Sequence, residues 1–245
     1  PAIIFLAFPF IYAFAVAPYS VFLKSLSDDK TLIALKISFV TAFLSTFISF
    51  VMGTPFAYFL ANKKRKMIFL DILIDIPNVL PPIIMGVILL QAYGRSSLVG
   101  RFLSIFGIEI PFSILAVVIA QIFVSISYFL KVAYSAFVGV DRTLKEEGLS
   151  IGLDELGVLI YIYLPVVKKG LVVGVLGTFS RALGEFGATI MFAGNVFGKT
   201  QTISLYIYSL FVENQDETLC VSLFMIVFSY VILYIAKRTL NNVDY

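Results

Sequence analysis

Two charged side chains interrupt an otherwise apolar stretch, and they are the first candidates for chemistry in this sequence. Arg181 and Glu185 stand four residues apart within the run 166–193. On a helix, side chains at this spacing lie one turn apart and can form an ion pair. A charge inside a membrane costs about 2.5–3.5 kcal/mol on insertion scales, so it is normally kept for a pair or a solute pathway. We therefore expect Arg181 and Glu185 to pair and lock helix packing, to lie beside a translocation path or gate, or to form an interfacial pair with no special role.

Hydroxyl and amide side chains near this pair could line a path for a polar solute. A polar or charged solute that crosses a region of low dielectric needs hydrogen-bond partners near its path. The donors near Arg181 are Thr178, Ser180, Thr189 and Asn195. The donors on the run 32–61 are Ser38, Thr41, Ser45 and Ser49. A hydroxyl in a membrane helix usually bonds back to its own backbone, so each residue alone is a weak candidate. The donors near Arg181, with Arg181 and Glu185, are our candidate path or gate residues.

Enzyme chemistry fits this sequence poorly. No histidine is present, which removes the commonest metal ligand, and Cys220 is the single cysteine, so no internal disulfide can form. The segment 193–200, AGNVFGKT, comes within one residue of a phosphate-binding loop, but it follows an apolar run rather than a strand of an α/β domain. We expect no catalytic residue, metal or cofactor on this chain. The net charge of +3 gives no reason to expect a nucleic acid partner.

The runs that must position these residues are long enough to span a bilayer. Hydrophobic residues make up 60% of the 245, and only 13% are charged, a balance not found in water-soluble domains of this size. A membrane-spanning helix needs about 20 apolar residues. We expect one all-α integral membrane domain over 1–245 with about six spans, at 2–23, 32–61, 68–93, 112–137, 166–193 and 219–236. Pro55 should kink the second span, and prolines should break the third.

The first run begins after Pro1 with no basic leader, so we expect the natural N-terminus to lie upstream. A cleaved signal peptide is disfavoured because this run is long enough to span a bilayer.

The longest charged interruption is the loop 141–165, DRTLKEEGLSIGLDELGVLIYIYLP. On a helical period, Val140, Leu144 and Ile151 share one face, and the charged residues point the other way. Leu149 sits among those charges, where a partner protein could grip it. The pattern predicts a short helix that lies along a surface instead of crossing the membrane.

Basic residues are unevenly divided between the two sets of loops. One set holds ten, namely Lys63, Lys64, Arg65, Lys66, Arg142, Lys145, Lys168, Lys169, Lys237 and Arg238. The opposite set holds five, namely Lys24, Lys30, Arg95, Arg101 and Lys199. Because cytoplasmic loops carry the excess of Lys and Arg, both termini and the loop 141–165 are expected in the cytoplasm.

The loop resembles the cytoplasmic loop of the membrane subunits of ABC-type importers. That family pattern reads E-A-A, three residues, Gly, nine residues, Ile, one residue, Leu-Pro. The residues that fall on this spacing are Glu146, Gly152, Ile162, Leu164 and Pro165. Glu147 and Gly148 replace the two alanines, and a glycine costs a helix about 1 kcal/mol relative to Ala, so we expect a more pliable loop. The ATPase-coupling residues implied by the resemblance are Glu146, Glu147, Gly148, Leu149, Gly152, Ile162, Leu164 and Pro165.

Gly152 and Pro165 have separate local roles in this loop. Gly152 permits a sharp turn because a positive φ costs glycine little, and Pro165 should mark the start of the next helix.

Three further segments narrow the resemblance. The segment 181–195, RALGEFGATIMFAGN, resembles the fifth-helix signature of molybdate and tungstate importer permeases, as do the segments 75–90 and 199–208. Sulfate and thiosulfate permeases share a related G-E-F/Y-G pattern but diverge after it. The resemblance covers most of 32–236. It implies a type I ABC importer permease fold in the cell membrane.

The same resemblance implies partners. The chain would be one half of a homodimeric channel that receives a tetrahedral oxyanion from an external binding protein. We expect molybdate or tungstate, with sulfate or thiosulfate as the alternative. Two copies of a cytoplasmic ABC ATPase, which carry the ATP and Mg, would grip the loops 146–165. The contrasting hypothesis is a stand-alone secondary anion transporter, which would need intramembrane carboxylates for ion coupling and would leave the loop without a purpose.

Overall fold

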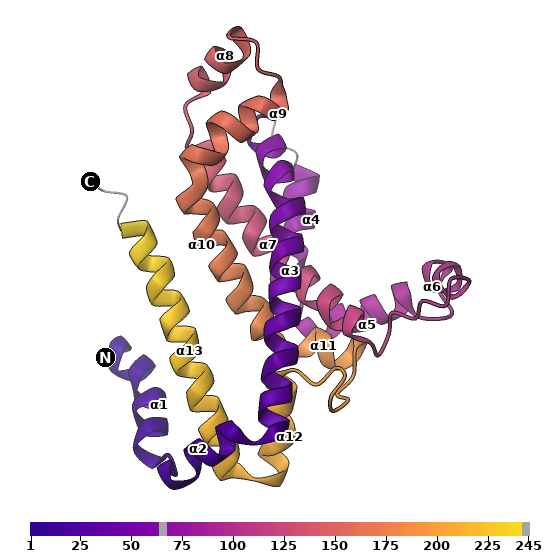
Figure 1. Cartoon of the computed structure of the whole chain (residues 1–245), viewed down its shortest axis with the longest axis vertical. Helices are drawn as coiled ribbons and strands as arrows, with labels where there is room; N and C mark the ends of the chain where they lie inside the picture. Colours follow the sequence, from indigo (N-terminus) through magenta and orange to yellow (C-terminus); the bar gives the residue numbers. More distant parts are fainter. Residues whose placement is uncertain (64–67, 242–245) are drawn as a thin grey trace.

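The structure, a computed structural model, describes residues 1–63 and 68–241, and it is helical with no strand in that part of the chain (Figure 1). The expected all-α class is confirmed. The elements are α1 Ala2–Val16, α2 Tyr19–Ser27, α3 Asp29–Ala61, α4 Ile68–Val79, α5 Pro82–Tyr93, α6 Leu98–Ser104, α7 Ile114–Val138, α8 Arg142–Ser150, α9 Glu155–Gly157, the π-helix η1 Val158–Tyr163, α10 Leu164–Leu183, α11 Gly187–Phe192, α12 Ile203–Glu213 and α13 Gln215–Asn241. Lys64, Arg65 and Lys66 of the basic cluster lie outside the described residues.

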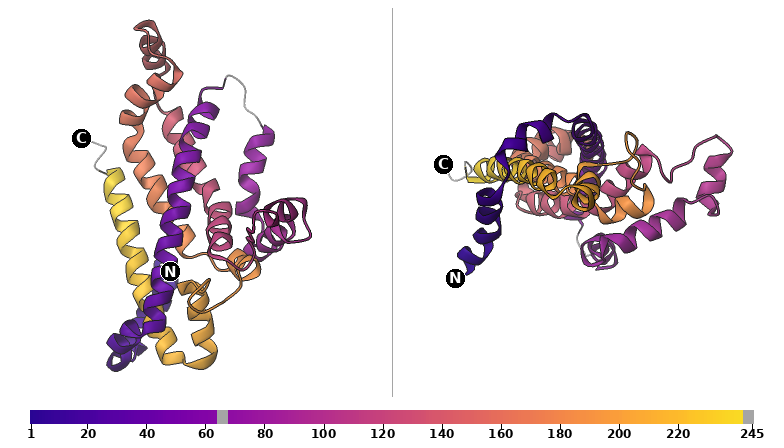
Figure 2. Two further views of the ribbon diagram at one scale, coloured as in Figure 1. Left: turned by 45° about the vertical axis from the view of Figure 1, so that its right-hand side comes forward. Right: turned by 90° about the horizontal axis from the view of Figure 1, so that it is seen from below.

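Four helices of the described chain are long and apolar enough to cross a membrane. They are α3, α7, the continuous helix Glu155–Leu183 and α13, and two bent helix pairs raise the number to six. α7 lies at the centre of the bundle, where it packs along α3 and α10, and α13 packs on the other side of α10 (Figures 1 and 2). The expectation of about six apolar spans is therefore met.

Two of the expected spans are bent helix pairs: the break in the third span was expected from its prolines, whereas the break in the first was not. α1 and α2 meet at 90°, and α4 and α5 meet at 113°. Both bends have the same cause, because a residue before proline is pushed out of the α region. Ala17 before Pro18 has ψ 132°, and Pro81 before Pro82 also has ψ 132°. In contrast, α3 continues through Pro55 as one helix of 33 residues, so the kink expected there does not end the helix.

The fifth span is longer and more interrupted than its apolar run indicated. Pro165 stands in the first turn of α10, as expected, but η1 precedes α10 without a break, so the chain is helical from Glu155 to Leu183. The helix stops at Gly184, and the chain resumes as α11 only at Gly187. The expected single span 166–193 is therefore broken near its end.

Two expected loops contain helices that the apolar pattern did not reveal. α6 lies within 94–111 and projects sideways from the bundle (Figure 2), and α12 lies within 194–217. Ser97 begins α6 by accepting a hydrogen bond from the Gly100 amide at 2.8 Å, a helix cap.

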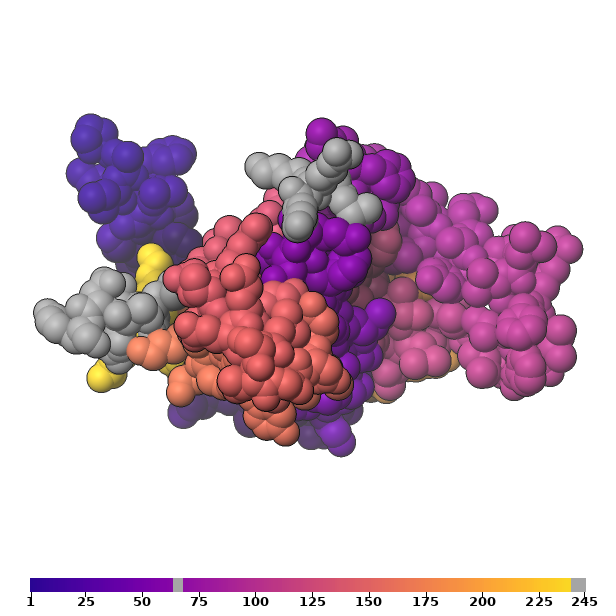
Figure 3. Space-filling model, turned by 90° about the horizontal axis from the view of Figure 1, so that it is seen from above, coloured from indigo at the N-terminus to yellow at the C-terminus, as the bar shows by residue number. Residues whose placement is uncertain are grey.

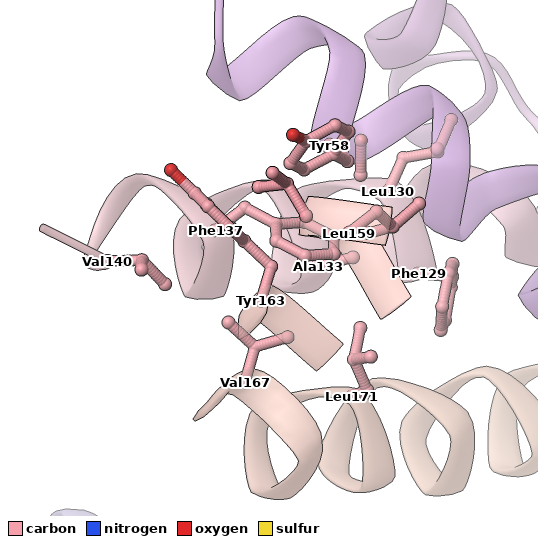
Figure 4. Close-up of a cluster of buried hydrophobic side chains, with 12 residues drawn as sticks. Tyr58, Phe129, Leu130, Ala133, Phe137, Val140, Leu159, Tyr163, Val167 and Leu171 are labelled. Atoms are coloured by element: carbon pink, nitrogen blue, oxygen red, sulfur yellow. The ribbon is translucent and has the colours of Figure 1, made fainter. Parts of the chain in front are cut away.

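The largest buried apolar cluster lies at the end of the bundle that carries α8 (Figure 4). Tyr58 of α3, Phe137 of α7 and Tyr163 of η1 meet there edge to face or tilted, with ring centroids 5.0 to 6.2 Å apart. Viewed from that end, α8 and its neighbouring turn form the near surface, and α1 and α6 project to different sides (Figure 3). This cluster packs the loop 141–165 against α3 and α7.

Candidate functional site

The loop after α7 forms the expected surface helix, α8. Asp141 begins the helix by accepting a hydrogen bond from the Thr143 amide at 3.0 Å, and this bond lowers the pKa of the Asp141 carboxyl. Gly152 follows the helix with φ 94°, a left-handed conformation that a side chain would strain. The expectation of a sharp turn at Gly152 is confirmed.

The inward face of α8 differs from the expected one. Val140 is buried and Leu144 packs against the buried cluster, as expected, but Ile151 lies beyond the helix end and is 79% exposed. Gly148 is the buried residue of α8 instead. A Cβ on Gly148 would lie 2.4 Å from Ile162 Cδ1, so the glycine lets α8 lie close against η1.

The outward face of the loop carries apolar and acidic groups together. Leu149, Ile151 and Leu156 are all exposed, at 41%, 79% and 61%, and Glu146 and Glu147 are exposed beside them. Leu149 is thus accessible as expected, whereas Ile151 and Leu156 were missed as possible contacts. We call this surface, made of Glu146, Glu147, Leu149, Ile151 and Leu156, the docking face.

A polar network ties the docking face to the bundle, and sequence reasoning did not find it. Lys145 Nζ of α8 lies 2.8 Å from Glu155 Oε1, and the Tyr58 hydroxyl of α3 donates a hydrogen bond to Glu155 Oε2 at 3.1 Å. Lys145 Nζ also lies 5.7 Å from the centre of the Tyr58 ring. Because Tyr58 belongs to the buried aromatic cluster, this network connects α8 to α3 and η1.

The helix that continues from this network contains the π-helix η1. π-helical turns are rare and occur often at functional sites. Val158, Leu159 and Tyr163 of η1 are buried in the aromatic cluster, while Ile160 and Tyr161 are exposed. The family-pattern residues Ile162, Leu164 and Pro165 therefore lie on this helix rather than on an exposed loop.

The second candidate region lies where two broken spans meet. A Cβ on Gly187, at the start of α11, would lie 2.8 Å from Pro82 Cβ, and a Cβ on Gly86 would lie 2.6 Å from the Ala188 oxygen. α11 and α5 therefore pack almost backbone to backbone. Non-helical backbone at membrane depth is tolerated where protein buries it or where it lines a cavity, so this paired break is a natural position for a path.

Arg181 and Glu185 do not form the expected ion pair. Glu185 is 5% exposed and accepts a hydrogen bond from the Ala188 amide at 2.7 Å, so it caps α11. None of the three ion pairs in the described residues includes Arg181, and its buried Nε has no hydrogen-bond partner. The spacing of four residues fails because the helix ends at Gly184, between the two charges.

Most candidate donors bond back to their own helix, and the exceptions are Ser38, Thr189 and Asn195. Thr178 donates to the Gly174 oxygen at 2.7 Å and Ser180 to the Leu176 oxygen at 3.0 Å. The hydroxyls of α3 that also bond to their own helix are Thr41, Ser45 and Ser49. Ser38 instead accepts a hydrogen bond from the Ile203 amide at 2.6 Å, which fixes the start of α12.

Thr189 and Asn195 differ from the other donors. Thr189 is fully buried, and its hydroxyl has no partner. Asn195 donates to Ser209 Oγ and accepts from Gln201 Nε2, both at 2.9 Å, so it holds the turn after α11 against α12. Arg181, Glu185 and Thr189 therefore lie near the paired break. Asn195 instead fixes the turn that follows α11.

A half-exposed ion pair on another face was not expected as a pair. Lys131 Nζ of α7 lies 2.7 Å from Asp75 Oδ1 of α4, and the two side chains are 51% and 47% exposed. Charged groups within membrane helices normally face protein or water. The face shared by α4 and α7 is therefore an unsuitable surface for lipid.

Comparison with known proteins gives a consistent result. Residues 53–244 match the family "Binding-protein-dependent transport system inner membrane component". The chain is 35% identical to the "Probable transport system permease protein NifC" of Clostridium pasteurianum, over 98% of this chain and 85% of that protein. It is also 35% identical to the "Molybdenum transport system permease protein ModB" of Mycobacterium tuberculosis, over 99% of this chain and 92% of that protein.

A solved structure has the same fold. It is a chain of a bacterial ABC transporter involved in the import of the acidic polysaccharide alginate, with a TM-score of 0.73 at 18% identity. The superposition covers 99% of this chain and 91% of that chain, so the similarity extends over the whole helical arrangement.

Proposed function

This chain belongs to the family of binding-protein-dependent transport system inner membrane components, multi-pass membrane proteins. From that premise we propose that it is the translocating subunit of an ATP-driven importer of a tetrahedral oxyanion, either molybdate or tungstate. In this proposal an external binding protein delivers the anion, and the chain passes it to the cytoplasm.

The observation that carries the proposal is the docking face and its attachment. The loop that contains α8 and α9 exposes Leu149, Ile151 and Leu156 next to two carboxylates. The carboxylates make this surface unsuitable for contact with lipid, but it fits a groove on another protein. The Lys145–Glu155–Tyr58 network links the loop that such a partner would contact to helix α3 of the bundle. We assign this face to a cytoplasmic ABC ATPase, one copy for each copy of this chain, with both termini on the same side of the membrane.

The path is proposed to form between two copies of this chain. The half-exposed Lys131–Asp75 pair favours a neighbour that is protein or water rather than lipid. A second copy that packs on the α4–α7 face would bury this pair and enclose the broken ends of α4 and α10. Arg181, with its unpartnered Nε, and the unpartnered Thr189 hydroxyl could then offer positive potential and a donor near the path.

The substrate is inferred from the relatives and from chemistry together. The Mycobacterium tuberculosis relative is named for molybdenum transport, and this chain matches it over nearly its full length. Molybdate and tungstate carry the same charge and shape, so the residues of this chain give no reason to separate them. A sulfate or thiosulfate importer remains the alternative.

This chain supplies no catalytic residue of its own in the proposal. ATP and Mg would be bound by the partner ATPase, and hydrolysis of the ATP would move the docking face. A stand-alone secondary transporter is disfavoured because Glu185, its best candidate for ion coupling, is used as the cap of α11.

The test is ATP-driven uptake in proteoliposomes that contain this chain, its ATPase and its binding protein. We expect uptake of molybdate that needs ATP and that tungstate blocks but sulfate does not. Equal competition by sulfate would favour the sulfate importer. Uptake that persists without ATP would refute the importer proposal and favour the secondary transporter.

A further inference from the structure

A polar cavity lies in the half of the molecule away from α8, beside the projecting α6 (Figure 1). Its volume is about 520 Å³, and it is bounded by the end of α5, the start of α7 and the turn after α11. Arg95, Glu109, Ser113 and Lys199 line it. The site described above does not use any of these side chains.

The cavity has an excess of positive charge. The Arg95 guanidinium donates a hydrogen bond to Glu109, and this bond raises the pKa of Arg95 above its usual value. Lys199 is exposed and takes no part in any ion pair of the described residues. Two cations therefore face one carboxylate, and one positive charge is left uncompensated.

The helix end in the cavity adds to this potential. Ser113 accepts a hydrogen bond from the Ala116 amide and is the N-cap of α7, a helix of 25 residues. The N-terminus of a helix carries a partial positive charge. Phe112, just before it, has φ 58°, and its amide donates to the Phe192 oxygen at the end of α11. The cavity therefore lies at the C-terminal ends of α5 and α11, whose N-terminal ends form the paired break.

Charges elsewhere on the expected outer side are segregated from this cavity. The acidic residues near the α2–α3 and α12–α13 junctions are Asp28, Asp29, Glu213, Asp216 and Glu217, against two lysines there, Lys24 and Lys30. Around the cavity, Arg101 of α6 adds a third cation. Such a charge distribution steers an anion toward the basic side.

We propose that this cavity is an arrival site for a tetrahedral oxyanion, bound between Arg95 and Lys199 with Glu109 as the competing partner of Arg95. A doubly charged anion would take over the Arg95 hydrogen bonds from Glu109, because the existing ion pair is 78% and 52% exposed and contributes little. The nature of the anion rests on the proposed function, whereas the charge and geometry of the site do not.

The test compares three single substitutions. Lys199→Gln removes the unpaired cation, Glu109→Gln removes the competing carboxylate, and Lys24→Gln is the matched control, an exposed lysine on the same expected side. One charge about 6 Å from a dianion changes its occupancy about tenfold at low salt, and about threefold at physiological salt. We expect Lys199→Gln to lower, and Glu109→Gln to raise, molybdate binding to the purified chain in equilibrium dialysis by these factors. Lys24→Gln should leave binding unchanged.

The same variants are then measured for initial uptake rate at limiting loaded binding protein. The expected result is a loss for Lys199→Gln and a gain for Glu109→Gln, both smaller at high salt. Unchanged dialysis and uptake for both would overturn the proposal, even where the wild type transports molybdate with ATP. Failure of the wild type to transport would instead refute the proposed function, while the dialysis would still decide the site.

Two other occupants would also overturn the proposal. If Lys199→Gln weakens attachment of the empty binding protein as much as the loaded one, the basic patch is a protein-docking surface. If the effects of Lys199→Gln vanish in vesicles that contain only zwitterionic lipid, the occupant is an anionic lipid headgroup. We expect binding-protein attachment to be unaffected and the effects to persist in both lipid compositions.

Discussion

Replacing Tyr58 by phenylalanine tests whether the docking face is coupled to the bundle through the polar network. The change removes only the hydroxyl that donates to Glu155 Oε2 at 3.1 Å. The ring keeps its edge-to-face contacts with Phe137 and Tyr163, at 5.7 and 5.0 Å, so the aromatic cluster should stay intact. The substitution therefore separates the polar link from packing.

The expected magnitude follows from the nature of the bond. A hydrogen bond to a charged group is worth about 1.5–3 kcal/mol, but the Glu155 side chain is 63% exposed, so we take about 1 kcal/mol. That free energy corresponds to about a fivefold change in the population of the coupled arrangement. We expect the number of anions imported per ATP hydrolysed to fall by about this factor.

The assay measures ATP hydrolysis and molybdate uptake in the same proteoliposomes. Tyr161→Phe is the matched control because Tyr161, in the neighbouring π-helix η1, loses the same hydroxyl but is 71% exposed. ATPase binding and thermal stability should be nearly unchanged in Tyr58→Phe. An unchanged ratio of uptake to hydrolysis would refute the reasoning, and a large loss of thermal stability would show that the hydroxyl serves folding instead.

The remaining predictions concern docking, the exposed ion pair and helix packing. Glu146→Lys should abolish ATPase co-purification and transport while the chain still inserts, because it reverses a charge on the docking face; retained uptake would contradict that assignment. Lys131→Ala and Asp75→Ala should each reduce uptake more than the double change, because each leaves the other charge of a 2.7 Å pair uncompensated, and additive losses in a double-mutant cycle would argue against pairing. Gly177→Ala should lower stability by about 1–3 kcal/mol in thermal unfolding, because its Cβ would lie 2.2 Å from an aromatic ring on α7. Gly184→Ala is its control, since the nearest atom there is 3.5 Å away, and equal losses would contradict the packing argument.

The apolar runs predicted where helices lie but not how they bend. Length and hydrophobicity located α3, α7, α10 and α13 because each must cross the same thickness of lipid. The bends at Pro18 and Pro81 have a local signal in the sequence, the residue before each proline. Their angles of 90° and 113° depend on what α2 and α5 pack against, which no local pattern records.

Features of the candidate site that depend on residues adjacent in sequence could be predicted, whereas features that depend on packing between helices could not. Gly152 was correctly expected to turn the chain because glycine alone adopts a positive φ at little cost. The prediction of an Arg181–Glu185 ion pair was wrong. Residues four apart face each other only on a continuous helix, and the helix ends at Gly184, between the two charges. The signal was present in the sequence, since glycine is a frequent helix terminator.

Contacts between distant segments left no such signal. Tyr58 and Glu155 are 97 residues apart, and neither residue belongs to the family spacing that identified the loop. Lys131 and Asp75 are likewise on different helices, and the local sequence of neither residue indicates the other as its partner. Polar links of this kind are determined by helix register, which becomes fixed only when α3, α4 and α7 are packed.

One continuous helix joins the two candidate regions, and this connection gives the proposed coupling a physical route. The helix from Glu155 to Leu183 has 29 residues, and at 1.5 Å per residue it is about 43 Å long. Its first residue belongs to the polar network under the docking face, and its last residue precedes the break where α11 packs on α5. Small residues line its contact with α7, since a Cβ on Gly170 or Gly177 would collide with α7 side chains. The helix is unbroken between these two points, so it can transmit a displacement as one rigid element. A movement imposed at α8 would therefore reach the paired break without unfolding any element between them.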